Sequence, residues 1–211
     1  MVARNNRLIL QGPLGGPGVQ GGVMVFSKGM SRRSAGFTLI EVLVTTTLMT
    51  ACSVVAIIQL LPGIRSDSAL QQVMIQLRQA RLMAIDERRD YTVTFQGTNE
   101  LVVVRQEIPS GTTQISDTFL PKDVTFMLTP GLPDTPDAFG NGYPVNFACP
   151  GNTVPCSILF QSDGTVLANG VLVNGTVFMA VAGSTDSARA VTLMGSTGRV
   201  HAFRSNGSAW F

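Results

Sequence analysis

One acidic residue is the clearest candidate for chemistry in this sequence. Glu41 is the only charged side chain between Phe37 and Ile64, a run of mostly apolar and hydroxyl-bearing residues. A carboxylate this far inside a membrane-spanning helix costs roughly 2.5–3.5 kcal/mol on insertion scales, so it needs a positive partner. We favour pairing with a charge on a neighbouring helix over the alternative, in which Glu41 reaches the lipid headgroups from an ordinary membrane anchor.

The element that would position Glu41 is a membrane-spanning helix. The stretch 37–64 is long enough to cross a bilayer of roughly 30 Å. Arg32 and Arg33 lie directly before it, and positive residues mark the cytoplasmic side of a membrane segment. We therefore expect residues 37–64 to cross the membrane once, with a cytoplasmic N-terminus and an extracytoplasmic head.

A second helical pattern follows in residues 65–90. Its apolar residues are three or four positions apart, which puts them on one face of a helix. The residues concerned are Leu70, Val73, Met74, Leu77, Ala80, Ala84 and Ile85. Pro62 lies between the two patterns and could kink the helix. We expect one helix of about 50 residues, on the order of 75 Å long, whose second half packs on the head.

From residue 91 the pattern changes to short β runs separated by turn signals such as Asn174-Gly175. The runs are 91–95, 100–105, 124–128, 157–161, 171–182, 188–194 and 199–204. Residues 130–155 contain several Pro and Gly and indicate a long surface loop. The expected fold class is α+β, with a long N-terminal helix packed on an antiparallel sheet in a head of residues 91–211.

Composition limits the classes of function. The 211 residues are 45% hydrophobic, which is enough to form the core of one head domain. The net charge of +2 is too small to attract a polyanion to the whole molecule. Charged residues make up only 13%, below the usual quarter or so, which suits a surface covered by lipid or by other subunits. Residues 1–29 offer nothing to a core, and Met30, or with less support Met24, is a candidate start codon.

Residues 36–43, GFTLIEVL, follow a short basic segment and open the apolar run. They resemble the processing motif of the type IV pilin and type II secretion pseudopilin superfamily. The resemblance implies a pilin fold, in which prepilin peptidase removes the leader 1–36 by cutting between Gly36 and Phe37 and methylates the new amine. It also implies that this amine neutralises Glu41 of an adjacent subunit during assembly.

The resemblance further implies a function and a location. The expected function is a minor pilin or pseudopilin that initiates or caps a type IV pilus or a type II secretion pseudopilus. Its partners would be other pilin-like subunits, the peptidase and the inner membrane, and its head would lie in the periplasm.

The head resembles the GspH/FimT branch of the superfamily, through FQSDG at 160–164 and a basic C-terminal segment. Some FimT-like members bind DNA through a Gly-Arg-x-Arg element, whose second arginine is replaced here by His201. An alternative function is therefore a DNA-binding minor pilin for natural transformation, with Arg189, Arg199 and Arg204 contacting phosphates. We favour the reading in which these arginines are solvated positions on an edge strand.

Cysteine usage adds two expectations. The sequence before Cys52 loosely resembles a lipobox, so a second alternative is a lipoprotein anchored at Cys52. Two observations oppose it, because Glu41 interrupts the apolar h-region and the apolar run continues beyond the cysteine. Cys149 and Cys156 flank a short loop, and we expect a disulfide between them in an oxidising compartment, which would stabilise the head by about 2–3 kcal/mol.

Catalytic and metal-binding patterns are missing from the sequence. His201 is its only histidine, so we expect no metal site. There is no nucleophile elbow and no phosphate-binding loop. We therefore expect neither an enzyme nor a bound cofactor.

Overall fold

The computed structural model describes residues 37–149 and 154–211, except for the side chains of residues 54–60. The leader, residues 1–36, lies outside the described residues, and with it the predicted cleavage residue Gly36 and the candidate start Met30. The chain divides into two compact units, Met1–Val44 and Thr45–Phe211.

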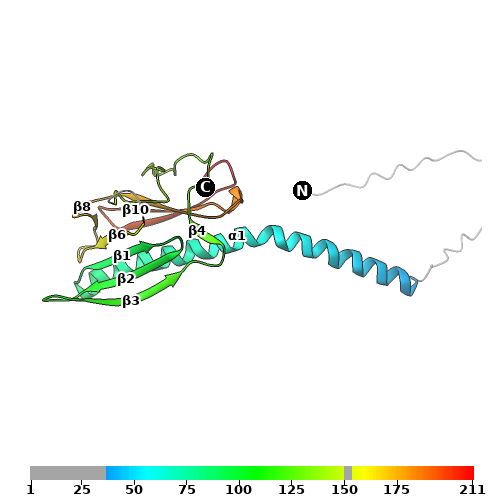
Figure 1. The fold of residues 1–211 in the computed structure, drawn as a ribbon, viewed down its shortest axis with the longest axis horizontal. Helices are drawn as coiled ribbons and strands as arrows, with labels where there is room; N and C mark the ends of the chain where they lie inside the picture. The colour runs from blue at the N-terminus through cyan, green and yellow to red at the C-terminus, as the bar shows by residue number, and fades with distance from the viewer. Residues whose placement is uncertain (1–36, 150–153) are drawn as a thin grey trace, which may run out of the picture. The chain divides into compact units, whose positions relative to one another are not determined.

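One helix, α1 (Leu39–Glu87), runs through the first described part of the chain (Figure 1). It has 49 residues, close to the predicted length, and Pro62 lies inside it without ending it. The helix ends where Arg88 adopts a left-handed backbone conformation, with φ 52°. The N–H of Arg89 then donates to the carbonyl of Ala84 at 3.2 Å, a bond that closes many helix C-termini.

The predicted membrane span, residues 37–64, covers the first part of α1. Within the described residues, no helical segment combines the length and the apolar character needed to cross a bilayer. The predicted span, 37–64, includes residues 54–60, whose side chains are not described. The span therefore stays a prediction.

The head contains two antiparallel sheets. The first has six strands in the order β3 (Thr112–Phe119), β2 (Glu100–Gln106), β1 (Tyr91–Gln96), β6 (Cys156–Phe160), β7 (Val166–Ala168) and β8 (Val171–Leu172). The second has the order β11 (Arg199–Arg204), β10 (Arg189–Met194), β9 (Gly175–Val181) and β4 (Val124–Phe126), with β5 (Val145–Asn146) also paired to β9. A short 3-10 helix, η2 (Thr185–Ser187), connects β9 to β10.

The predicted fold class, a long N-terminal helix packed on an antiparallel sheet, is confirmed, but three details differ. The sheet is divided into two. The predicted run 171–182 is split into β8 and β9. Strands β3, β5 and β7 were not predicted, and β5 lies within the predicted loop 130–155.

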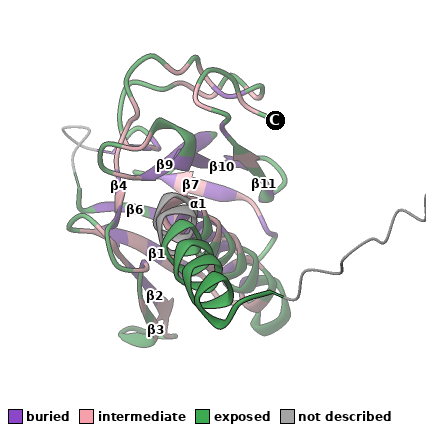
Figure 2. Ribbon diagram, turned by 90° about the vertical axis from the view of Figure 1, so that its right-hand side faces the viewer, coloured by how far each residue is buried: buried purple, intermediate pink, exposed green. Residues whose placement is uncertain are grey.

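The core forms where the second half of α1 lies in the angle between the two sheets (Figure 2). Buried residues recur along one face of the helix, namely Ser66, Ala69, Leu70, Val73, Leu77, Ala80 and Ala84. Strand β1 alternates buried and partly buried positions, so Tyr91, Val93 and Phe95 face the helix side. The predicted amphipathic face is therefore the one that packs, although Ile85 remains 40% exposed.

The segment between β4 and β6 is anchored to the core by one aromatic residue. Phe147 is fully buried, and its ring stacks on Phe95 with the centroids 5.8 Å apart. Gly175 in β9 leaves the room for it, since a Cβ atom there would lie 2.1 Å from the Phe147 ring. The predicted surface loop thus includes a core residue.

Candidate functional site

The predicted assembly site lies at the start of α1. Thr38 precedes the first helical residue, and its Oγ1 accepts a hydrogen bond from the backbone N–H of Glu41 at 3.3 Å. The carbonyl of Thr38 accepts the first helical bond, from the N–H of Val42 at 3.2 Å. Thr38 is therefore the N-cap residue, and Glu41 stands at the third helical position, where a negative charge also interacts favourably with the helix dipole.

The role of Thr38 was missed in the sequence, although a signal for it was present. A threonine followed three residues later by a glutamate is the spacing of a capping box. The same motif that resembles a processing site therefore also specifies where the helix begins. This fixes Glu41 in the first turn of α1, four residues after Phe37.

The helix around Glu41 exposes an unusual amount of apolar surface. Every described residue from 37 to 53 is exposed. The large hydrophobic side chains among them are Phe37, Leu39, Ile40, Val42, Leu43, Val44, Leu48 and Met49, each between 47% and 83% exposed. Contiguous apolar surface of this kind marks a protein-binding or membrane-binding segment.

The family comparison bears on this same segment. Residues 31–57 match the model described as the prokaryotic N-terminal methylation motif. The chain therefore carries the prokaryotic N-terminal methylation motif. The match includes both predicted processing residues, Gly36 and Phe37, and the predicted assembly residue, Glu41. The search of curated proteins found no match to this chain.

Two solved structures are similar to parts of this chain. The minor pseudopilin EpsH from the type 2 secretion system of Vibrio cholerae is 15% identical, with a TM-score of 0.45 over 66% of this chain and 97% of EpsH. The type IV minor pilin FimU of Pseudomonas aeruginosa is 14% identical, with a TM-score of 0.44 over 69% of this chain and 96% of FimU.

The three arginines of the predicted DNA contact do not form one patch. Arg189 and Arg204 are paired across β10 and β11 at one end of the hairpin, whereas Arg199 pairs with Met194 at the other end. Arg189 is only 6% exposed, and its Nε donates to Asp67 at 2.6 Å. Arg204 Nε lies 3.2 Å from the same carboxylate oxygen. The expectation that all three are solvated is wrong for Arg189.

Arg189 instead connects α1 to the second sheet. Besides Asp67, it donates to the carbonyls of Asp186 and Ala188, at 2.8 and 2.9 Å. Its Nη2 lies 3.5 Å from the carbonyl of Gly63. Because the guanidinium is buried, these bonds are shielded from water and hold the helix just after Pro62 against β10.

We expect Arg189→Ala to destabilise the head by about 2–3 kcal/mol, because truncation leaves the carbonyls of Asp186 and Ala188 without their charged donor and removes the shorter of the two arginine contacts of Asp67. The measurement is urea or thermal unfolding of the full chain in detergent, followed by circular dichroism. Arg204→Ala is the matched control, since it contacts the same Asp67 from a side chain that is 48% exposed and should cost less than about 1 kcal/mol. Equal losses in the two variants would contradict the structural role of Arg189.

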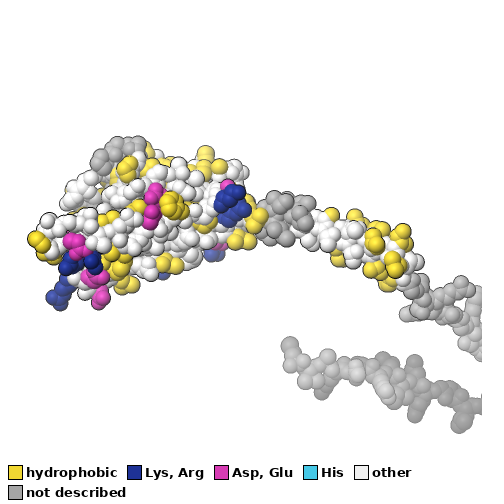
Figure 3. Space-filling view, turned by 60° about the horizontal axis from the view of Figure 1, so that its bottom comes forward, with side chains coloured by type: hydrophobic (Ala, Val, Ile, Leu, Met, Phe, Trp, Pro, Cys, Tyr) yellow, Lys and Arg dark blue, Asp and Glu magenta, His cyan; other side chains and the backbone are white. Residues whose placement is uncertain are grey.

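Several other arginines of the head are neutralised within the chain. Arg105 pairs with Glu87 at 2.9 Å and with Glu107 at 2.7 Å, and Arg89 also pairs with Glu107. The Thr113 hydroxyl and then the Arg105 guanidinium hold the pKa of Glu107 below its usual value. On the face shown in Figure 3, basic and acidic side chains accordingly lie side by side.

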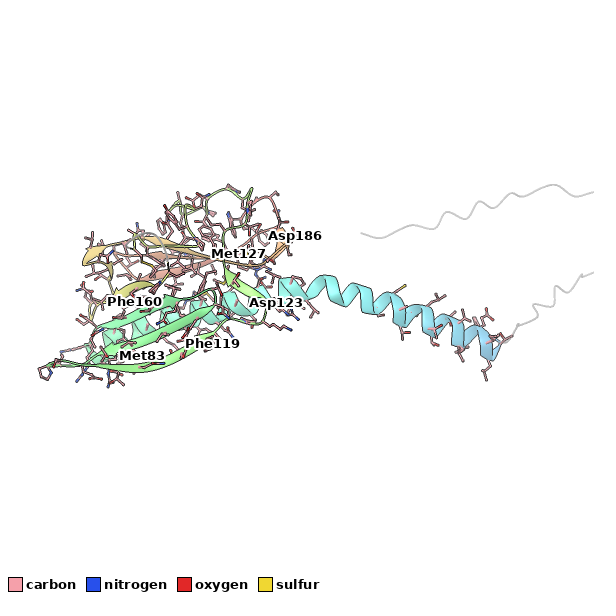
Figure 4. The ribbon with its side chains drawn as sticks, viewed as in Figure 1. Met83, Phe119, Asp123, Met127, Phe160 and Asp186 are labelled. Carbon is pink, nitrogen blue, oxygen red and sulfur yellow. A yellow bond between two sulfur atoms is a disulfide. The ribbon has the colours of Figure 1, made fainter. Side chains whose placement is uncertain are left out.

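A further ion pair joins α1 to the turn before β4. Asp123 lies next to α1 (Figure 4), and its carboxylate is 2.5 Å from Arg65. Both side chains are partly exposed, so the pair contributes little stability. Its effect is to orient the helix against the head.

The cysteines occupy two different settings. Cys149 and Cys156 are joined by a disulfide, with their Cα atoms 5.5 Å apart, and both are buried. Cys52 is a free and exposed residue of α1. His201 contacts Asp137 at 3.3 Å, and within the described ranges no three side chains of His, Cys, Asp or Glu gather as a metal site would require.

Proposed function

We propose that this chain is a minor pilin or pseudopilin, a structural subunit that initiates or caps a type IV pilus or a type II secretion pseudopilus. The observation that carries the proposal is the methylation motif over residues 31–57. The motif includes the start of α1, where every described residue from 37 to 53 is exposed. Such a helix needs a second surface to cover it.

Lipid covers the apolar helix before assembly, and the helices of neighbouring subunits cover it afterwards. In this proposal residues 37–64 cross the inner membrane once, and the head lies in the periplasm. The subunit can leave the membrane for a filament because both environments bury the same apolar side chains. The difference in free energy between the two states must then come from polar groups.

Glu41 supplies that difference. Prepilin peptidase cuts between Gly36 and Phe37, which creates a positive amine four residues before the carboxylate. In a stack of parallel helices, the amine of one subunit neutralises Glu41 of the next. Charge pairing in an environment of low dielectric is strong when both partners are held in place, and Thr38 fixes the helix start that holds Glu41.

The experiment that tests the proposal is intact-mass spectrometry of the mature chain from the native host. We expect a polypeptide that begins at Phe37 and carries one N-methyl group, recovered with sheared filaments or with the secretion complex. A chain that begins at Cys52 and carries lipid would establish the lipoprotein alternative instead. A chain that keeps its leader would reject processing altogether.

The DNA-binding alternative has less support. Two of its three arginines are already paired with Asp67, so only Arg199 remains for a phosphate. One arginine gives one phosphate contact, and affinity for DNA grows with the number of such contacts. The structural role is therefore the function we propose.

A further inference from the structure

A groove opens between α1 and the β10–β11 hairpin of the head. It has a volume of about 630 Å³. Its lining consists of Arg78, Arg81, Leu82, Met194, Thr197, Gly198, Arg199, Val200 and His201. Three guanidinium groups thus meet in one concave surface, two from the helix and one from β11.

These three arginines differ from most other arginines in the described part of the chain, where Arg88, outside the groove, is the one other arginine with no ion pair. Arg65, Arg89, Arg105, Arg189 and Arg204 each pair with a carboxylate of the chain. Arg78, Arg81 and Arg199 have no such partner among the described residues. Since arginine stays protonated in proteins, the groove concentrates positive charge that the chain does not neutralise.

Arg81 has a second unsatisfied feature. Its Nε is buried and has no hydrogen-bond partner in the described part of the chain. A buried donor of a charged group that lacks a partner costs free energy. The Arg81 side chain also lines the groove, and a guanidinium binds a carboxylate through charge-assisted hydrogen bonds.

Gly198 makes room for Arg81, because a Cβ atom at Gly198 would lie 2.6 Å from the Cδ and Nε atoms of Arg81. A Cβ atom at Gly164 would lie 2.9 Å from Ile85 and 3.5 Å from Arg81 Nε, which is ordinary contact. Gly198 and Gly164 have positive φ angles, of 61° and 84°. Residues that carry a side chain adopt this backbone conformation only with strain. The turns that precede β7 and β11 therefore hold the Arg81 side chain in place.

The remaining lining indicates what kind of oxyanion would fit. Leu82, Met194 and Val200 give the groove an apolar component, and Leu82 is 60% exposed. No phenylalanine, tyrosine or tryptophan lines it, whereas single-stranded nucleic acid binds mainly by stacking on aromatic rings. Asp137, which accepts from Thr192 at 2.5 Å and contacts His201 at the groove edge, would also repel an extended chain of phosphates.

We infer that this groove binds a segment of a neighbouring pilin-like subunit, of different sequence, that carries an Asp or Glu carboxylate next to an apolar side chain. The carboxylate pairs with Arg81 and Arg199, and the apolar side chain covers Leu82. The inference rests on the proposed function, because a subunit that initiates or caps a filament has other subunits, rather than copies of itself, beside it. Charge complementarity is the argument for this occupant.

The test is site-specific photocrosslinking in cells that assemble the filament, with a benzophenone amino acid in place of Leu82 in the full chain. We expect a crosslink to another subunit with the methylation motif, at a peptide that contains Asp or Glu. The double variant Arg81→Gln/Arg199→Gln should lower the yield about tenfold or more, as expected when charged hydrogen bonds are lost. Arg88→Gln, which removes one exposed charge directly after the end of α1 and outside the groove, is the matched control and should leave the yield unchanged.

The inference would be overturned by an unchanged yield in the double variant, by a crosslink to a second copy of this chain, or by a crosslink to nucleic acid. For each variant, the fraction of the chain that is cleaved and the amount that sediments with filaments are also measured. A wild-type chain that is cleaved and sediments with filaments but gives no crosslink at position 82 overturns the groove alone. A chain that does not sediment with filaments overturns the proposed function as well.

Discussion

Glu41→Ala should leave the chain inserted and cleaved but reduce its incorporation into filaments on the order of 100-fold. The estimate assumes that pairing with a neighbouring amine recovers most of the roughly 2.5–3.5 kcal/mol that a carboxylate costs inside a bilayer. Alanine removes the cost in the membrane and, with it, the gain on assembly. The measurement is quantitative immunoblotting of the sheared filament fraction against the membrane fraction.

Two variants separate the charge of Glu41 from its position in the helix. Glu41→Asp keeps the carboxylate on a shorter side chain and should keep part of the incorporation. Thr38→Ala keeps Glu41 but removes the N-cap hydroxyl that accepts from its N–H, which weakens the helix start by about 1 kcal/mol. Filament levels equal to wild type in Glu41→Ala would reject charge pairing as the basis of assembly.

The helix was predictable because its signals are local. The face that is buried in the second half of α1, from Leu70 to Ala84, repeats every three or four residues in the sequence. The start was equally readable, since Thr38 and Glu41 have capping-box spacing. Neither feature depends on residues far away in the chain.

The missed strands lack the pattern that sequence analysis uses. Strand β3, Thr112–Phe119, exposes most of its residues, so it shows no alternation of apolar and polar positions. Strands β5 and β7 contain only two and three residues. The division into two sheets depends on pairings such as that of β1 with β6, which join distant parts of the chain.

The setting of Arg189 was misjudged for a similar reason. A basic residue in a strand near the C-terminus suggests a solvated position, but Arg189 bonds to Asp67, 122 residues earlier in the chain. The same packing brings Arg78 and Arg81 of α1 beside Arg199 of β11. By contrast, the processing motif is one continuous segment and could be found without any structure.

Gly36→Ala should produce the second large effect, a fall in cleavage of about tenfold or more. Glycine has no Cβ and reaches backbone conformations that alanine does not, so a methyl group beside the scissile bond disturbs the geometry that the peptidase requires. Without cleavage, no amine forms at Phe37, and Glu41 has no partner in a neighbouring subunit. The uncut precursor should therefore stay in the membrane as a slower-migrating band on a gel and be depleted from filaments.

Ala35→Gly is the matched control for this variant, because it changes one methyl group at the adjacent leader position and keeps the Gly36–Phe37 junction. It should be cut at the wild-type rate. The intact mass of the retained Gly36→Ala precursor would also identify its first residue. That residue shows whether translation starts at Met30, at Met24 or at Met1. A mature Gly36→Ala chain of normal abundance whose intact mass does not correspond to a start at Phe37 would show that the leader is removed at another bond. Pairing between Glu41 and a Phe37 amine would then lose its chemical basis.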